Sequence, residues 1–347
     1  MFSLPRRTRW AALLLLFTLI WRLMGSPLSP REWASLPSQG QMAVRQLPVR
    51  ARRLLNNWLP PETDTPSVSV YDPQHEKTLS LALDEYLLGV VAAEMPASYH
   101  LEALKAQTVA ARTRLAAPPK ASHPQASVCT DSGCCQGYLS PRARLERWGE
   151  DSEAYEKRIR QALREADGLI LTYEGEPIQM LYHAVSGGRT EDAAQVFSQS
   201  LPYLQSVESP GEEGSAKYET RSQWSCQEAA TLLNAAFPQA HAEAEMLGAQ
   251  LAVRETSPSG RALWVQVGDQ LVSGTDFRKA LSLNSTWLSI HCTQSLLTVT
   301  QRGYGHGVGM SQAGANAMAA RGGAMADILS HYYPGTQLHE IASPGTT

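Results

Sequence analysis

Apolar residues near the start of the globular part of this chain recur with helical spacing, and one acid shares their face. The residues at positions i, i+3, i+4 and i+7 are Leu87, Val90, Val91 and Glu94. Pro96 ends the predicted helix, which places the Glu94 carboxyl in the last turn. There the negative end of the helix dipole and burial both disfavour the charged carboxylate. Glu94 is therefore a candidate general acid, since a carboxyl that stays protonated near neutral pH can donate a proton.

The next run, Leu101–Leu115, has the pattern of a second helix and carries two cations. Lys105 and Arg112 lie seven residues apart, which puts them on one stripe about two turns from each other. Two roles suit them: holding an anionic substrate, or balancing the charge of Glu94. The simpler interpretation of Glu94 is a helix-end side chain that is exposed to water or paired with one of these cations.

The rest of the pattern predicts a mixture of strands and helices. Alternating apolar residues predict strands at 67–71, 78–83, 169–173, 177–182, 251–254, 262–267 and 295–300. Helical spacing predicts further helices at 152–166, 227–237, 311–320 and 324–332. Because the two types follow no steady β-α rhythm, we expect an α+β fold, with mixed helices and antiparallel strands forming a cleft-containing body over residues 67–340. We expect a strand-rich lobe over about 248–300 and a tail over 341–347.

The first 25 residues have the features of an export signal that stays attached. Arg6, Arg7 and Arg9 precede the apolar run Trp10–Trp21, and no A-x-A-like cleavage site follows. We expect a signal anchor, a transmembrane helix over residues 1–25, with the N-terminus in the cytoplasm and the body outside the membrane. A buried helix of a soluble protein is the alternative.

A tether rich in proline and arginine follows over residues 26–66. Within it, residues 44–58 mix arginine with apolar side chains, so this part either lies on an anionic membrane surface or serves as a plain linker. The full chain of 347 residues has a net charge of −3, which argues against a general nucleic-acid binder.

Three of the five cysteines gather in the predicted loop over residues 122–139. His123, Cys129 and Cys135 are spaced six residues apart, and imidazole nitrogen together with thiolate sulfur suits zinc. Cys134, a water molecule and a residue distant in sequence are the alternatives for a fourth ligand. A disulfide is the alternative to a metal site, since the thiols of an exported chain can become oxidised. The two remaining cysteines, which could pair with each other, are Cys226 and Cys292.

The glycine-rich segment Gly303–Gln312 contains one histidine, His306. It matches neither the G-x-G-x-x-G nor the P-loop signature of nucleotide sites. Alternate glycines beside a histidine indicate backbone close to a ligand or to another segment, so His306 either braces the turn or contacts substrate. The chain also lacks H-E-x-x-H and G-x-S-x-G, the usual signals of metalloproteases and α/β-hydrolases.

Several ordered motifs together resemble one known family. They are LLGVVAAEMPAS at 87–98, LEALKAQ at 101–107 with AAR at 110–112, SGG at 186–188, RKALSL at 278–283 followed by STW at 285–287, GHGVGMSQ at 305–312 and HYYPG at 331–335. In this order they resemble the stage II sporulation protein D and amidase-enhancer family (SpoIID/LytB), from about residue 67 to residue 338. The N-terminal anchor and tether resemble the sporulation branch of that family.

The resemblance implies a membrane-anchored lytic transglycosylase that cleaves peptidoglycan glycan strands, particularly strands stripped of stem peptides, during engulfment in sporulation. It implies that the bond between N-acetylmuramic acid and N-acetylglucosamine is broken and that a 1,6-anhydro sugar is formed. The catalytic acid of the family falls on Glu94. Its substrate-contacting positions fall on Lys105, Arg112, Tyr182, Ser186 and His306.

Zinc-containing members of that family carry a His-x5-Cys-x5-Cys pattern, which matches His123, Cys129 and Cys135 and leaves out Cys134. We expect zinc to be structural, because thiolate-rich loops hold folds together and an acid such as Glu94 needs no metal. The resemblance also implies two protein partners, a peptide-stripping amidase and a multi-spanning membrane protein.

Two alternatives come from other functional classes. One is a noncatalytic glycan-binding scaffold that recruits or enhances a peptidoglycan amidase. The other is a zinc hydrolase, in which the metal rather than the carboxyl would carry the chemistry.

Overall fold

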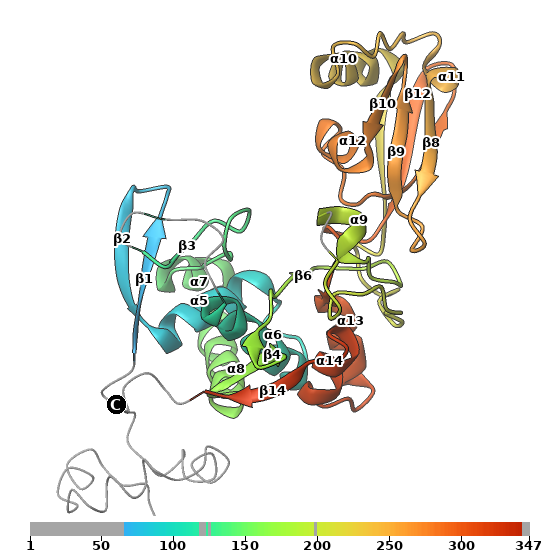
Figure 1. The fold of residues 1–347 in the computed structure, drawn as a ribbon. Helices are drawn as coiled ribbons and strands as arrows, with labels where there is room; N and C mark the ends of the chain where they lie inside the picture. The colour runs from blue at the N-terminus through green and yellow to red at the C-terminus, as the bar shows by residue number, and fades with distance from the viewer. Residues whose placement is uncertain (1–65, 118–122, 124–125, 198–199, 342–347) are drawn as a thin grey trace, which may run out of the picture.

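The computed structural model describes residues 66–117, 123, 126–197 and 200–341. The predicted signal anchor over residues 1–25, the tether up to residue 65 and the tail after residue 341 lie outside these ranges. No helix within the ranges is long and apolar enough to cross a membrane. The described residues form an α+β fold of helices and mainly antiparallel strands, as the sequence predicted (Figure 1).

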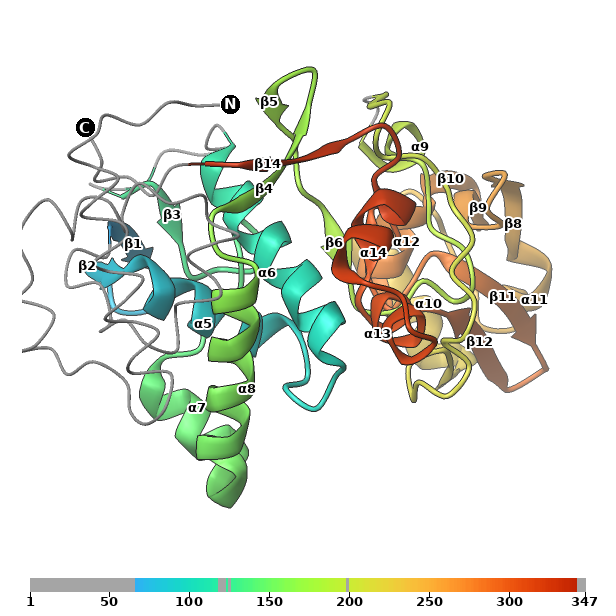
Figure 2. The same ribbon diagram turned by 90° about the horizontal axis from the view of Figure 1, so that it is seen from below.

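Helices form the centre of the part of the molecule that contains Glu94. They are α5 (Leu83–Glu94), α6 (Leu101–Ala116), α7 (Pro141–Trp148), α8 (Ser152–Glu165), α13 (Gln312–Ala320) and α14 (Met325–Tyr332). Figure 2 shows α6 between α5 and α8 on one side and α13 and α14 on the other, and α6 contacts all four.

The helices α5 and α6, which the sequence predicted around Glu94 and Arg112, are buried on more than one face. In α5 every residue from Tyr86 to Ala92 is buried, and the buried residues of α6 are likewise spread around the helix. A helix with neighbours on several sides is apolar around its circumference, so the single stripe predicted from i, i+3 and i+4 spacing was too narrow. Alanine supplies much of the buried surface of α6, which lets neighbouring helices approach it closely.

Small sheets surround the helical centre. One sheet has the order β2-β1-β3 and contains β1 (Ser67–Asp72), β2 (Lys77–Ala82) and β3 (Val128–Cys129). Another has the order β14-β4-β5 and contains β4 (Leu169–Tyr173), β5 (Glu176–Pro177) and β14 (Gln337–Glu340). A parallel pair, β6 (Tyr182–His183) and β13 (Met310–Ser311), brings Tyr182 beside the glycine-rich segment.

A second apolar core lies in the strand-rich lobe at the upper right of Figure 1. Its two antiparallel sheets are β7 (Glu219–Ser225), β11 (Trp287–Cys292) and β12 (Leu296–Arg302), and β8 (Leu251–Thr256), β9 (Ala262–Val267) and β10 (Gln270–Ser273). Its helices are α10 (Cys226–Ala236), α11 (Leu247–Gln250) and α12 (Gly274–Ala280). The lobe thus starts earlier than the expected residue 248, because the polar-looking strand β7 pairs along its whole length with β12.

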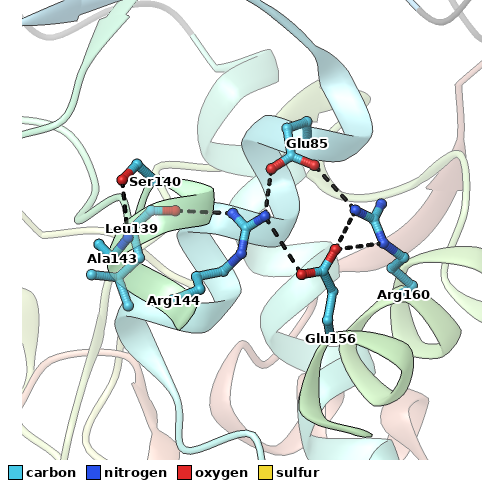
Figure 3. A network of polar contacts seen from close by, with 7 residues as sticks. All are labelled: Glu85, Leu139, Ser140, Ala143, Arg144, Glu156 and Arg160. Carbon is cyan, nitrogen blue, oxygen red and sulfur yellow. Dashed lines mark hydrogen bonds and ion pairs between the residues drawn. The ribbon is translucent and has the colours of Figure 1, made fainter. Parts of the chain in front are cut away.

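An ion-pair network around the buried Arg144 holds the first turn of α5. Arg144 of α7 donates to Glu85 at 2.5 Å, and Arg160 of α8 donates to Glu85 at 3.2 Å and to Glu156 at 2.6 Å (Figure 3). Arg144 is almost fully buried and also donates to the Leu139 carbonyl at 3.0 Å. These contacts join three helices and fix the N-terminal end of the helix whose last residue is Glu94.

Candidate active site

Glu94 ends α5 in a half-buried position where two hydrogen bonds hold its carboxyl. The backbone N–H of Gly137 donates to Glu94 Oε1 at 3.0 Å, and the side chain of Gln312 forms a second hydrogen bond. Burial raises the pKa of the Glu94 carboxyl above its ordinary value, and the two hydrogen bonds only partly oppose that rise. The predicted pairing of Glu94 with Lys105 or Arg112 does not occur, since these cations have other partners.

A pocket with a volume of about 360 Å³ opens beside this carboxyl. Segments far apart in sequence line it: the end of α5, α6, the cysteine loop, the strand β6, the short helix α9 (Ala193–Phe197) and the glycine-rich segment. Among the described residues that line it, Glu94 is the only carboxylic acid.

Tyr182 lines the pocket and is tied to the cysteine loop. Its hydroxyl donates to Gln136 Oε1 at 3.0 Å, and Gln136 Nε2 in turn donates to the Tyr86 hydroxyl at 3.3 Å. Burial, followed by the nearby charge of Glu94, raises the pKa of Tyr182 well above its ordinary value. The phenol therefore stays neutral and acts only as a hydrogen-bonding group.

His306 and its neighbour His183 both line the pocket. The Val308 backbone fixes both rings: its N–H donates to His306 Nδ1 at 3.0 Å, and its carbonyl lies 3.1 Å from His183 Nδ1. His183 Nδ1 must therefore carry a proton, and His306 Nδ1 must accept one. The rings are 5.8 Å apart, and burial lowers the pKa of His183 well below its ordinary value. His306 therefore braces the turn and also lines the pocket, while its contact with substrate stays a prediction.

Three predicted substrate contacts lie elsewhere. Lys105 pairs with Glu102 at 2.5 Å and with Glu165 of α8 at 3.2 Å. Arg112 is buried and donates to the Ala166 carbonyl at 2.6 Å. Neither cation lines the pocket. The side of α6 that carries both cations faces α8 and the start of β4. In this structure the two cations therefore hold α6 against these elements.

Ser186 is the third residue outside the pocket, and it belongs to a buried network around Glu212. Its hydroxyl and backbone N–H both donate to the Glu212 carboxylate, at 2.9 and 2.8 Å, and the Gly187 N–H donates at 3.0 Å. Ser209 donates to the same carboxylate at 2.5 Å. Ser186 therefore shapes the loop that follows β6 and does not face the pocket.

A buried arginine of the strand-rich lobe, Arg261, hydrogen-bonds to the loop that follows β6. Arg261 Nη2 donates to the carbonyls of Ser186 at 2.7 Å and Arg189 at 2.9 Å. The buried Glu191 carboxylate accepts hydrogen bonds from Ser257 and Ser259 beside this arginine. At Gly307, where φ is +85°, a Cβ would lie 2.7 Å from the Arg261 guanidinium, so any other residue there would strain the backbone and push this side chain aside.

The cysteine loop brings four potential metal ligands together: His123, Cys129, Cys134 and Cys135. Their ligand atoms all lie within 4.8 Å of one another. His123 Nε2 is 3.3 Å from the Cys135 sulfur and 3.8 Å from the Cys134 sulfur, and the two sulfurs are 4.0 Å apart. The structure thus unites the three predicted ligands and adds Cys134, one of the three alternatives for the fourth.

Several site residues were not identified from the sequence as separate functional positions. Gly137 and Gln136 lie in a loop without periodicity, so nothing local indicates their bonds to Glu94 and Tyr182. Gln312 is the last residue of the glycine-rich motif at 305–312. Its membership of that motif is the sequence feature that could have identified it as a site residue. Arg114 lines the pocket two residues after Arg112, on a helix whose packing partners decide which side chains reach the site.

Comparison with known proteins agrees with the motifs. A family model described as stage II sporulation protein (SpoIID) matches residues 71–173. Stage II sporulation protein D of Bacillus subtilis is 36% identical over 278 residues, which cover 79% of this chain and 79% of that protein. The protein of the same name from Bacillus amyloliquefaciens is 36% identical over 288 residues, 80% of each chain. The amidase enhancer of Bacillus subtilis is 27% identical over 299 residues, 73% of this chain and 40% of that protein. This chain belongs to the stage II sporulation protein D family.

Proposed function

We propose that this protein is a lytic transglycosylase that cleaves the bond between N-acetylmuramic acid and N-acetylglucosamine in peptidoglycan glycan strands. One observation carries the proposal: among the described residues that line the pocket there is one carboxyl, that of Glu94, and burial raises its pKa. Ordinary retaining and inverting glycosidases need two carboxyl groups. A reaction with an internal nucleophile needs one, and membership of the sporulation family supports action on the cell wall.

The mechanism uses the Glu94 carboxyl twice. Protonated Glu94 donates its proton to the glycosidic oxygen as the bond from that oxygen to muramic C1 breaks. The resulting carboxylate then accepts the proton of the muramic C6 hydroxyl while that oxygen bonds to C1. The products are a strand ending in N-acetylglucosamine and a 1,6-anhydromuramic end, and Glu94 is protonated again.

The residues around Glu94 supply orientation. The Gly137 N–H and the Gln312 side chain hold the carboxyl in place in both charge states. Tyr182 and His306 offer neutral hydrogen-bonding groups on the pocket wall, where sugar hydroxyl and acetamido groups would lie. Lys105, Arg112 and Ser186 act in this proposal by supporting the helices and the loop.

We propose zinc as the ion of the cysteine loop, in a structural role. A tetrahedral zinc ion with ordinary bond lengths separates its nitrogen and sulfur ligands by about 3.5 Å and its sulfurs by about 3.8 Å. The observed separations of 3.3, 3.8 and 4.0 Å fit that set. His123 and the three cysteines would hold the ion and leave no open position for chemistry. Chelation should lower the melting temperature; loss of activity with an unchanged fold would favour the zinc hydrolase instead.

The cellular setting of the proposal follows from the N-terminal sequence. A single-pass anchor would hold the body on the outer face of the cell membrane, where glycan strands lie, during engulfment in sporulation. A peptide-stripping amidase and a multi-spanning membrane protein would be the protein partners. Fractionation of cells with protease accessibility of the body tests this placement, and a body protected inside the cytoplasm would contradict it.

The decisive experiment digests denuded glycan with the purified chain and with Glu94→Gln. Mass spectrometry should find 1,6-anhydromuramic ends with the parent protein and none with the variant. Near-parental turnover by Glu94→Gln would refute the assignment of the acid. If the parent protein binds the glycan and leaves it unchanged, the second candidate holds, a scaffold that enhances an amidase, which the name of the amidase enhancer relative favours.

A further inference from the structure

Two buried glutamines connect α6 to the acid at the end of α5. Gln107 lies on α6 and is fully buried, and Gln312, the first residue of α13, is 5% exposed. Gln312 Nε2 donates to Gln107 Oε1 at 3.4 Å, a bond between residues 205 positions apart in the sequence. The side chain of Gln312 also forms the second hydrogen bond to Glu94. Hydrogen bonds therefore run from Gln107 through Gln312 to Glu94.

The direction of these hydrogen bonds matters, because an amide can present either its nitrogen or its oxygen to a neighbour. A carboxylate only accepts hydrogen bonds, whereas a protonated carboxyl also donates one. The bond from Gln312 lowers the pKa of Glu94, so the amide nitrogen faces the acid and stabilises its charged form. Gln312 Nε2 carries two hydrogens, which suffice for one bond to Gln107 Oε1 and one to Glu94.

The oxygen of Gln107 holds the Gln312 amide in this orientation. If the Gln312 amide turned over by itself, its oxygen would face Gln107 Oε1, and two buried acceptors would meet without a hydrogen between them. The nitrogen of Gln107 has no hydrogen-bond partner among the residues that the structure describes. A buried amide nitrogen without a partner costs free energy, so a glutamine here needs a reason other than packing. The bond from Gln312 to its oxygen supplies that reason.

Hydrogen bonds, and not nearby charges, oppose the effect of burial on Glu94. Arg147 of α7 reaches the same turn of α5 but donates to the Ala92 carbonyl at 3.4 Å. The other titratable groups that line the pocket are Arg114, Cys134, Cys135, Tyr182, His183 and His306. The pKa of Glu94 responds to burial and to the bonds from Gly137 and Gln312, not to the charges of these groups. The orientation of the Gln312 amide is therefore one of two polar contacts that control the protonation of the acid.

We propose that Gln107 is a positioning residue, whose amide oxygen keeps the nitrogen of Gln312 directed at Glu94. A donor that is held in place favours the carboxylate and leaves the hydroxyl of the protonated acid without an acceptor on Gln312. The inference rests on the function proposed above in taking Glu94 as the acid and base. In that reaction Glu94 passes through both charge states, and the fixed donor keeps the carboxylate available for the second half.

The test is an NMR titration of the Glu94 carboxyl carbon in the full chain, with Glu94→Gln identifying its signal. Gln107→Met preserves the length of the side chain and removes the oxygen. The freed Gln312 amide can then turn its oxygen toward the protonated acid. The midpoint of the titration should rise by about 0.5–1 pH unit, the contribution of one hydrogen bond between neutral groups. The descending limb of kcat against pH should move by the same amount.

Three further variants separate positioning from a general loss of packing. Thr108→Val removes a buried hydroxyl of the same helix that donates to the Leu104 carbonyl, and it should leave the midpoint unchanged whatever its melting temperature. Gln107→Asn withdraws the oxygen by one carbon–carbon bond and should also raise the midpoint, which provides a test if Gln107→Met does not fold. In a Gln312→Met background, Gln107→Met should cause no further rise, because Gln107 acts through Gln312.

Three results would overturn the inference. One is an unchanged midpoint in folded Gln107→Met. Another is a fall of the midpoint, which would mean that both amides are turned the other way, with Gln107 Nε2 donating to Gln312 Oε1. The third is a further rise in the Gln312→Met background, which would mean that Gln107 acts on Glu94 by another route.

The outcome is separable from that of the proposed function, because the titration needs no turnover. A raised midpoint without anhydromuramic products would refute the transglycosylase and retain the role of Gln107. Anhydromuramic products with an unchanged midpoint would retain the enzyme and refute that role.

Discussion

The backbone N–H of Gly137 donates to Glu94 Oε1 at 3.0 Å, and this bond joins the cysteine loop to the end of α5. Gly137 follows Cys135 by two residues, so an ion that orders the loop also orders the donor on the acid. A Cβ at Gly137 would lie 3.3 Å from the same oxygen, which leaves little room for any other residue. The proposed zinc would thus position the acid without taking part in the reaction.

The rate of glycan cleavage should fall on the alkaline side of the pH profile. Glu94 must be protonated to donate, and burial raises its pKa above the ordinary value of 4.5. The apparent pKa of the descending limb of kcat against pH should therefore be above 4.5, and this limb should report the deprotonation of Glu94. A limb at the ordinary value, in protein that remains folded, would contradict a buried acid.

Glu94→Gln should make the protein more stable at neutral pH. Because the folded-state pKa is raised, the native state binds more protons than the unfolded state between 4.5 and the raised value. Stability of the parent protein therefore falls as pH rises through this window, and the variant lacks this fall. Melting temperatures should coincide near pH 4 and diverge in favour of Glu94→Gln toward pH 7. Equal melting temperatures at both pH values would show that the carboxyl is not penalised by burial.

Arg261→Ala should destabilise the fold strongly. The substitution leaves the buried Glu191 carboxylate without its neighbouring cation and frees two carbonyls of the loop after β6. Removing one member of a buried charge pair costs about 3–5 kcal/mol in the free energy of unfolding. The matched control is Arg189→Ala, which removes a solvent-exposed pair with Glu208 and should cost about 0–1 kcal/mol. Urea unfolding of both variants checks this; similar losses would mean that Arg261 is not the link between lobe and loop.

Cys226 and Cys292 should form a disulfide when the chain is treated with a small disulfide donor such as oxidised glutathione. Their sulfurs are 3.5 Å apart, although the residues lie 66 positions apart in the sequence. The bond would close a long loop across the strand-rich lobe and stabilise it by about 4 kcal/mol. A mass loss of two hydrogens and a linked peptide are expected, with Cys292→Ser as the control. Full retention of both thiols after treatment would contradict the prediction.

Local signals made Glu94 a candidate for a buried acid, because each of them acts within one helix. Helical spacing places it with Leu87, Val90 and Val91, and Pro96, two residues later, ends the helix. Its contact with Gly137 was not visible in the same way. That bond spans 43 residues and depends on where the cysteine loop settles, which no periodicity describes.

The cysteine spacing likewise predicted a metal site but not its composition. His123, Cys129 and Cys135 stand at regular intervals, whereas Cys134 enters the set because a turn held by the Asp131 carbonyl brings it beside Cys135.

The sequence by itself determined the main helices and several of the strands, the acid at the end of α5 and the set of chemical groups available for a site, but it did not predict β7, β11 or α7. Only the tertiary structure decided which of those groups meet. The spacing of Lys105 and Arg112 placed them correctly on one stripe of α6, yet α8 and β4 pack along that stripe. Arg114, two residues further on, reaches the pocket instead. The reason is physical: a helix surrounded by neighbours has no single functional face until those neighbours are in place. The neighbours of α6 come from segments that lie 54 to 205 residues away in the sequence, as the contacts of Arg112 with Ala166 and of Gln107 with Gln312 show.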